Sequence, residues 1–345
     1  MKKRFKGVVL FLVLVMLVSL TACSGGAAEE PAVEEPAEGE EPAVEAPEEV
    51  PSVALVLNGP INDMGWNASA YAGLNLIEAN YGAEVSFSES IAQSDMEEVF
   101  RSYATMGYDL IFGHGSQFTD AITVVAADYP ESMFVLINGN APAAPNLACV
   151  QVADEQQGFL MGAFAALMTE TGTVGVIGGA EIPPITNAVK GFEAGAAYAD
   201  PEIEVLSSMT GSFEDVNAAK ETALAFIDQG ADYVAAIANQ AGLGSIEACE
   251  DRGVYAIGAN QDQFDVAPSA VVVSVLKEVP IAFDFAYKTF MEGNLTPETF
   301  RLGVKEGVVF FSSYHDFEDF VPQEVKDRMA EIEAELAAGS ITILD

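Results

Sequence analysis

The feature that most constrains this chain is a regular alternation of short apolar segments and longer amphipathic segments, which begins near Ser52. Apolar segments of roughly five residues, spaced by helical patterns of roughly ten to fifteen residues, indicate βαβ units and a parallel sheet. The alternation restarts after a predicted helix over 156–169. We therefore expect an α/β fold with two successive lobes of similar size, in which right-handed crossovers bring the carboxyl ends of the strands to one rim.

The expected elements follow from this periodicity. Strands are predicted near 53–58, 84–89, 109–113, 132–137, 147–152, 173–177, 203–208, 232–237, 254–258, 270–275 and 308–311. Helices are predicted near 67–80, 94–106, 117–128, 156–169, 185–199, 214–229, 241–252, 280–292 and 322–337. Periodicity leaves open on which lobe the C-terminal tail packs.

Residues 1–22 have the organisation of a secretory signal peptide. A cationic start that ends at Lys6 is followed by an almost wholly apolar run over 7–20, which is too short for a comfortable membrane span. Small residues then precede Cys23, an order that looks like a bacterial lipoprotein processing site. We expect cleavage before Cys23, lipidation of this residue and an extracytoplasmic protein anchored to the cell membrane. An ordinary signal peptide with a chance cysteine is the alternative.

Residues 23–52 are expected to form a disordered tether between the lipid and the lobes. The stretch from Ser24 to Ser52 contains ten Glu and neither Lys nor Arg. A segment of Glu, Pro and Ala cannot bury a core and is extended by its own charge. Its acidity is explained most simply by a solvated spacer.

The composition limits the partners. The chain has 14 Lys and Arg against 53 Asp and Glu, a formal net charge of −39. Because phosphate neutralisation needs basic patches, nucleic acid is excluded as a partner. The two histidines, His114 and His315, form no cluster with metal-ligand spacing, so we expect no metal and no cofactor. Cys149 and Cys249 are expected to be buried free thiols, with a disulfide as the alternative.

The predicted strands end in loops that share one chemistry. Ligands of open parallel sheets bind outside the carboxyl ends of the strands, where these loops lie. Asn and Gln offer both donors and acceptors, and aromatic rings offer flat apolar faces, so the loops suit a neutral ligand that forms hydrogen bonds. A turn residue or a helix N-cap is the plain alternative for each Asn. The candidates chosen on this ground are Asn58, Trp66, His114, Asn138, Phe213, Asn239, Gly242 and Asn260.

Signatures of enzymes are scarce. Gly242-Leu243-Gly244 is weak support for a phosphate site, because Glu247 stands where a dinucleotide fingerprint has its third glycine. His114 and Ser116 lie too close on one turn for mutual activation. Lys277 ends an apolar strand and could orient a ligand, although a surface lysine paired with Glu278 or a neighbouring acid is the default.

Short motifs spread along the chain from about Ser52 resemble those of the basic membrane protein family, which consists of bacterial substrate-binding lipoproteins similar to the purine-nucleoside receptor lipoproteins. The motifs are Asp63-Met64-Gly65-Trp66-Asn67, residues 107–113, Gly158 to Gly162, Gly178-Gly179, residues 191–195, Gly211-Ser212-Phe213, Gln229-Gly230-Ala231-Asp232, residues 253–258, Asp262-Gln263 and Ser274-Val275-Leu276-Lys277.

The resemblance implies a type I periplasmic-binding fold, with a ligand cleft between the lobes and an ABC importer as the partner. Lobe 1 would comprise 53–155 and about 278–305, and lobe 2 would comprise 156–277 and about 306–345. Trp66 and Phe213 look like the two aromatic residues that sandwich the ligand's base. Asp63 and Asn67 fall in the family's first loop, where Asn67 matches a polar contact, and Lys277 matches a lysine that meets the ligand in nucleoside receptors. We expect a monomer that is not an enzyme.

Three positions depart from the family's pattern. Asn58, Asn138 and Asn260 stand where family members often have Asp, whose carboxylate engages ribose hydroxyls or base nitrogens. Asn can still bond to hydroxyls but cannot favour a protonated group. The expected ligand is a purine nucleoside or a related purine, and a free purine base, a flavin or another neutral heterocycle stays open. A ligand sensor for a signalling partner and a nucleoside hydrolase are the alternative functions.

Overall fold

The computed structural model describes residues 50–62, 66–143 and 145–344. Cys23, the predicted signal peptide, almost all of the tether and Asp63 lie outside these residues. The strands of the first sheet are β1 (Val53–Val56), β2 (Val85–Ser88), β3 (Leu110–His114), β4 (Met133–Ile137), β5 (Leu147–Val152) and β11 (Thr299–Leu302). The strands of the second are β6 (Thr173–Gly178), β7 (Glu204–Met209), β8 (Tyr233–Ile237), β9 (Tyr255–Asn260), β10 (Val271–Lys277) and β12 (Val309–Phe311).

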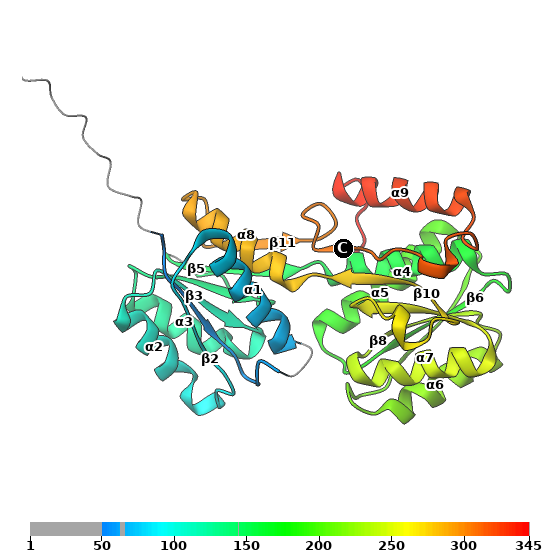
Figure 1. Ribbon diagram of the computed structural model, residues 1–345, viewed down its shortest axis with the longest axis horizontal. Helices are drawn as coiled ribbons and strands as arrows, with labels where there is room; N and C mark the ends of the chain where they lie inside the picture. Colours follow the sequence, from blue (N-terminus) through cyan, green and yellow to red (C-terminus); the bar gives the residue numbers. More distant parts are fainter. Residues whose placement is uncertain (1–49, 63–65, 144, 345) are drawn as a thin grey trace, which may run out of the picture. The chain divides into compact units, whose positions relative to one another are not determined.

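The two sheets repeat one topology. Their strand orders are β11-β5-β4-β3-β1-β2 and β12-β10-β9-β8-β6-β7, so five strands in each sheet follow the same doubly wound order. Figure 1 shows the two sheets with helices around them. All pairs in the first sheet are parallel, including β11 with β5, whereas β12 pairs antiparallel with β10 in the second. The predicted fold of two lobes, each with a mainly parallel sheet, is thereby confirmed.

Helices cover both faces of each sheet. In lobe 1, side chains of α2 and α3 pack on one face of the sheet, and α1 packs with α8 on the other. In lobe 2, α6 and α7 cover one face, and α4 with α5 covers the other. The helices are α1 (Trp66–Tyr81), α2 (Met96–Met106), α3 (Thr119–Asp128), α4 (Asp154–Met168), α5 (Pro183–Ala199), α6 (Val216–Asp228), α7 (Gly242–Arg252), α8 (Val279–Met291) and α9 (Gln323–Ala337).

The chain passes between the lobes at three described places: from β5 to α4, from β10 to α8 and from β11 to β12. Backbone hydrogen bonds tie these passages together, because Ala153 N donates to Leu302 O and Glu278 N donates to Val308 O. The C-terminal helix α9 contacts α4, so the tail packs on lobe 2.

Glycines let α4 lie very close to α5. A Cβ at Gly158 would stand 1.8 Å from Ala188 O, and one at Gly195 would stand 2.0 Å from Phe159 O. The backbones therefore touch where a side chain would separate them. This contact fixes the start of α4, which carries three polar side chains of the site described below.

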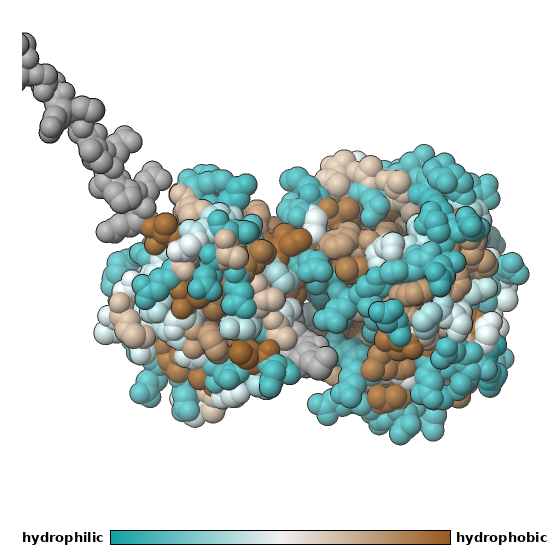
Figure 2. Space-filling model, in the orientation of Figure 1, coloured by the Kyte–Doolittle hydropathy of each residue, from teal (hydrophilic) through white to brown (hydrophobic). Residues whose placement is uncertain are grey.

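The predicted elements agree closely with the observed ones, except for β11. Its sequence, Thr299-Phe300-Arg301-Leu302, is short and mixed, and only its parallel pairing with β5 makes it a strand. Hydrophilic residues cover much of the face shown in Figure 2. Among the described residues, no helix has the length and apolarity that a membrane crossing requires.

Candidate functional site

The rim of lobe 1 contains an aromatic stack. Trp66, at the start of α1, lies on the ring of His114 at the end of β3, with ring centroids 3.8 Å apart and an interplanar angle of 24°. His114 Nε2 lies 2.9 Å from Trp66 O, so one side chain contacts both the ring and the backbone of Trp66. His114 is fully buried and Phe283 of α8 lies behind it, with ring centroids 5.7 Å apart. Trp66 is therefore held from one side and remains partly exposed.

The first loop is fixed by Asn67. Its Oδ1 accepts a hydrogen bond from Gly59 N at 3.3 Å, and its side chain is 7% exposed. A Cβ at Gly59 would lie 2.5 Å from Asn67 Nδ2, so a larger residue there would displace this amide. Asn67 thus has a structural contact within the loop, whereas Asn58 is exposed to solvent. Both residues remain predicted ligand contacts.

Three of the four strand-end asparagines have a left-handed backbone. Asn138, Asn239 and Asn260 have φ values of 54°, 49° and 68°. Asn adopts this conformation more readily than most residues other than glycine, which gives a local reason for its presence. Asn138 also accepts a hydrogen bond from Val152 N through Oδ1 at 3.1 Å, so this oxygen holds two strand ends of lobe 1 together. The left-handed backbone therefore gives these three asparagines a structural role, and their contact with a ligand stays a prediction.

At the rim of lobe 2, the ring of Phe213 packs against the backbone of Gly179. A Cβ at Gly179, after β6, would lie 2.6 Å from two ring carbons of Phe213, so glycine makes room for this ring. Phe213 O accepts a hydrogen bond from Ala241 N at 2.9 Å, which ties the loop to the start of α7. Phe213 is half-buried and lies on the strand-end rim where the sequence places it.

Two asparagines of lobe 2 are linked through hydrogen bonds to a buried glutamine. Gln157 of α4 is 0% exposed, and its Nε2 donates to Asn260 Oδ1 at 3.1 Å and to Val275 O at 2.9 Å. Asn260 Nδ2 donates in turn to Asn239 Oδ1 at 3.4 Å. Sequence reasoning missed Gln157. A polar residue beside the packed Gly158 in a largely apolar helix was the available signal.

Lys277 is paired with an acid that the sequence did not indicate. Its Nζ lies 2.7 Å from Asp154 Oδ1, and the two side chains are 12% and 9% exposed. Pairing with the adjacent Glu278 was the expected default. The observed partner comes instead from the start of α4, and the pair is buried. A second pair lies beside it, where Arg301 of β11 binds both carboxylate oxygens of Glu155.

Gly244 is explained by packing. A Cβ at this position would lie 2.0 Å from Val216 O of α6, so the glycine permits the close approach of α6 and α7. Gly242 begins α7 after a short 3-10 turn at Asn239–Ala241, and a Cβ there would make only an ordinary contact, 3.4 Å from Ala236 Cβ. Packing therefore accounts for Gly244 without a phosphate, and Gly242 stays a predicted ligand contact.

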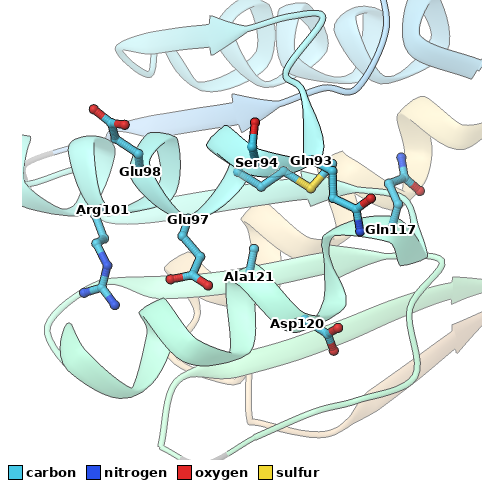
Figure 3. A pocket seen from close by; sticks show the side chains of 9 residues that line it. Gln93, Ser94, Glu97, Glu98, Arg101, Gln117, Asp120 and Ala121 are labelled. Atoms are coloured by element: carbon cyan, nitrogen blue, oxygen red, sulfur yellow. The ribbon is translucent and has the colours of Figure 1, made fainter.

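Two further pockets lie away from the predicted site residues. One, of about 620 Å³, is polar and opens beside α2 and α3 of lobe 1 (Figure 3). Its lining residues are Gln93, Ser94, Met96, Glu97, Glu98, Arg101, Gln117, Asp120 and Ala121. The other, of about 300 Å³, lies at the amino ends of β8 and β9. Within the described part of the chain, no group of three His, Cys, Asp or Glu residues could hold a metal ion.

Cys149 and Cys249 are free and buried, as predicted. Burial raises the pKa of the Cys249 thiol to about 12. Burial also raises the pKa of Cys149, an effect that a hydrogen bond from Ala141 N opposes. Neither thiol is poised for chemistry near neutral pH.

Known proteins resemble this chain over most of its length. The transcriptional activator protein med of Bacillus subtilis (strain 168) is 30% identical over 284 residues, which cover 82% of this chain and 87% of that protein. Basic membrane protein A of Borreliella burgdorferi is 31% identical over 274 residues, with coverage of 76% and 79%. A solved transcriptional activator of the comK gene from Bacillus halodurans aligns with a TM-score of 0.73 and 28% identity, over 83% of this chain and 97% of that one.

A solute-binding protein of an ABC transporter system from Aeropyrum pernix K1 shares the fold, with a TM-score of 0.70 at 24% identity and coverage of 85% and 92%. The family model described as "ABC transporter substrate-binding protein PnrA-like" matches residues 50–341. That match includes both lobes and all three passages between them. The chain therefore belongs to the basic membrane protein family of PnrA-like ABC transporter substrate-binding proteins.

Proposed function

We propose that this protein captures a purine nucleoside or a related purine between its two lobes and delivers it to an ABC importer. The observation that carries the proposal is the Trp66–His114 stack, which presents a supported and partly exposed indole ring at the rim of lobe 1. A planar heterocycle gains apolar contact area against such a ring. Phe213 would cover the opposite face of the ligand when the lobes close.

The polar groups favour a neutral ligand. Asn239 and Asn260 supply amides at the rim of lobe 2, and neither carries a charge. The ammonium of Lys277 is neutralised by Asp154 at 2.7 Å, so this cation is already balanced before a ligand arrives. A free purine base or a flavin meets the same requirements and is the alternative ligand.

The remainder of the proposal concerns delivery. We propose that residues 1–22 direct export, that Cys23 carries the lipid anchor and that residues 23–52 hold a monomeric receptor beside its permease. Substrate-binding proteins of importers act outside the cytoplasm, which agrees with this placement.

A second candidate function is ligand sensing. It is favoured by the relative named transcriptional activator protein med and by the solved activator from Bacillus halodurans. In that case the closed, ligand-bound form would be recognised by a signalling protein instead of a permease. Ligand-dependent stimulation of ATP hydrolysis by the reconstituted importer would favour transport, and its absence alongside tight ligand binding would favour sensing.

Isothermal titration calorimetry tests the binding proposal. The titrants are inosine, guanosine, adenosine, hypoxanthine and riboflavin, with D-ribose as the control without a planar ring. We expect saturable binding of at least one heterocycle, a change in Trp66 fluorescence in the same titration, and no heat from ribose. No heat from any of the five heterocycles would refute the proposal.

A further inference from the structure

Three side-chain amides in lobe 2 form a chain whose direction is set at its buried end. The chain runs from Gln157, inside the lobe, through Asn260 to Asn239, which is exposed at the rim. Each amide has a donor end and an acceptor end, so the direction of one determines the direction of the next.

The buried end is anchored by a group that can only accept. Val275 O takes a hydrogen bond from Gln157 Nε2 at 2.9 Å. The reverse orientation would place Gln157 Oε1 against this carbonyl oxygen, and two acceptors repel in a buried site. The observed orientation holds even though Gln157 Oε1 has no hydrogen-bond partner among the described residues. The anchor therefore fixes Gln157 as a donor towards Asn260.

The remaining directions follow in order. Asn260 must turn Oδ1 towards Gln157 Nε2, at 3.1 Å, which leaves its Nδ2 pointing along the chain. Asn260 Nδ2 then donates to Asn239 Oδ1 at 3.4 Å, a long bond that a ligand could replace at small cost. Asn239 is left with its own Nδ2 as the outermost group. Both asparagines thus present N–H groups outward from Gln157.

We propose that this rim selects ligands by offering hydrogen-bond donors, so that the bound ligand must place an acceptor, a carbonyl oxygen or a ring nitrogen, against Asn260 and Asn239. Gln157 is the positioning residue, because it determines the direction of Asn260 without needing to touch the ligand. This inference rests on the proposed function, in which the ligand lies against the rim of lobe 2.

An aspartate at position 260 would turn this part of the rim from a hydrogen-bond donor into an acceptor. A carboxylate accepts at both oxygens, so one would bind Gln157 Nε2 and the other would face outward as an acceptor. Such a rim would favour a donor on the ligand. The identity of residue 260 therefore switches the preferred ligand group.

The test compares Asn260→Asp with wild type, and Asn140→Asp is the matched control. Asn140 is exposed after β4 and accepts a hydrogen bond from Thr299 Oγ1 at 3.1 Å, so an aspartate there adds the same charge to lobe 1, outside the amide chain and the candidate site, and keeps this bond. Dissociation constants are measured for two ligand pairs by calorimetry. One pair is inosine and adenosine, which exchange donor and acceptor on the base. The other is inosine and 3′-deoxy-3′-fluoroinosine, in which fluorine removes the hydroxyl donor and keeps the size.

In N260D we expect the affinity ratio of at least one pair to change by about tenfold or more. The ratio of inosine to adenosine would shift against the base that wild type prefers. The ratio of inosine to its 3′-fluoro analogue would shift in favour of the hydroxyl. A tenfold ratio corresponds to about 1.4 kcal/mol, the scale of one hydrogen bond. Ratios that change no more in N260D than in N140D would overturn the inference while leaving nucleoside binding intact. Wild type that binds neither nucleoside nor base would instead remove the proposed function, and the inference with it.

Gln157→Met tests the positioning role separately. Methionine fills a similar volume but donates no hydrogen bond, so Asn260 could turn either way. In Q157M we expect the ratio of the dissociation constants of the two ligands in each pair to move towards one. In Q157M/N260D we expect the N260D ratio to persist, because a carboxylate has no direction to lose. If the Gln157→Met change weakens every ligand equally, both alone and together with N260D, then Gln157 has only a structural role. Thermal unfolding establishes that each variant is folded.

Discussion

The strand-end rims of the two lobes offer the proposed ligand different chemical groups. Lobe 1 offers an aromatic ring. Trp66 stacks on the buried His114, and His114 Nε2 contacts the backbone oxygen of Trp66. Besides the ring of Phe213, lobe 2 offers amides, with Asn239 and Asn260 in left-handed conformations and directed from Gln157. Apolar stacking is tolerant of substituents, whereas hydrogen bonds reject a group of the wrong polarity. From this contrast we predict that Trp66 supplies mainly affinity and that the amides of lobe 2 supply discrimination.

The largest expected effect concerns the two ion pairs where α4 begins. Asp154→Ala leaves the ammonium of Lys277, whose side chain is 12% exposed, without its partner, which should cost about 3–5 kcal/mol of unfolding free energy. Glu155→Ala releases Arg301, whose side chain is 49% exposed, and should cost only about 1 kcal/mol or less. Urea unfolding of both variants measures the difference. Equal losses would show that burial does not separate the two pairs.

Removal of the indole ring should be the largest loss on the lobe 1 side. Trp66→Ala is expected to weaken every heterocycle by a similar factor, about ten- to a hundredfold, because stacking of a base on an aromatic ring contributes about 1–3 kcal/mol. Trp66→Phe keeps a ring and should recover most of the affinity. Calorimetry with inosine and adenosine provides the measurement. A change in the ratio of their affinities in W66A would contradict the division between affinity and discrimination.

A smaller effect is expected from the residue behind the indole. His114→Phe keeps a ring beneath Trp66 but removes the contact of Nε2 with Trp66 O, which lies 2.9 Å away. We expect a loss of about 1 kcal/mol in stability and a several-fold loss of ligand affinity, since the ring is held less firmly. Thermal unfolding and Trp66 fluorescence report the two effects. Unchanged affinity in H114F would mean that stacking alone positions the indole.

The smallest expected signal is the labelling of the thiols, one in each lobe. Cys249 has a pKa raised to about 12 by burial, and burial also raises that of Cys149, so almost no thiolate exists at pH 8 in the folded protein. Iodoacetamide should therefore modify neither residue until its own lobe opens, as peptide mass spectrometry can show. Because the folded pKa values are raised, stability should fall as pH rises above the ordinary thiol value towards 12. Rapid labelling of either cysteine in the native protein would contradict its burial.

Much of the fold could be predicted from the sequence because strands buried on both faces read as apolar runs. Val271 to Leu276 and Met133 to Ile137 are examples, and both are strands in the structure. The strand β11 could not be found this way, because Thr299–Leu302 becomes a strand only by pairing with β5, far away in the chain. Its Arg301 binds Glu155, an interaction without a local signal.

The elements that carry the candidate residues were predictable from the sequence, but the contacts of these residues were not. Strand-end loops had to gather at the rims, so Trp66, Phe213 and Asn260 were placed correctly on their elements. The partners of these residues come from other elements. Gln157 lies 103 positions from Asn260, and Asp154 lies 123 positions from Lys277. The packing of α4 against β10 and the rest of the second sheet brings those side chains into place.

The central claim is that the lobes hold a planar heterocycle, and the molecule that the protein carries when isolated tests it most directly. Native mass spectrometry of the full-length protein, isolated in mild detergent, gives the mass of any bound ligand. We expect one bound molecule with the mass and ultraviolet absorbance of a purine nucleoside, a purine base or a flavin. A bound solute without a planar ring, such as a monosaccharide, would contradict the claim, as would an empty protein that gives no heat with the heterocycles.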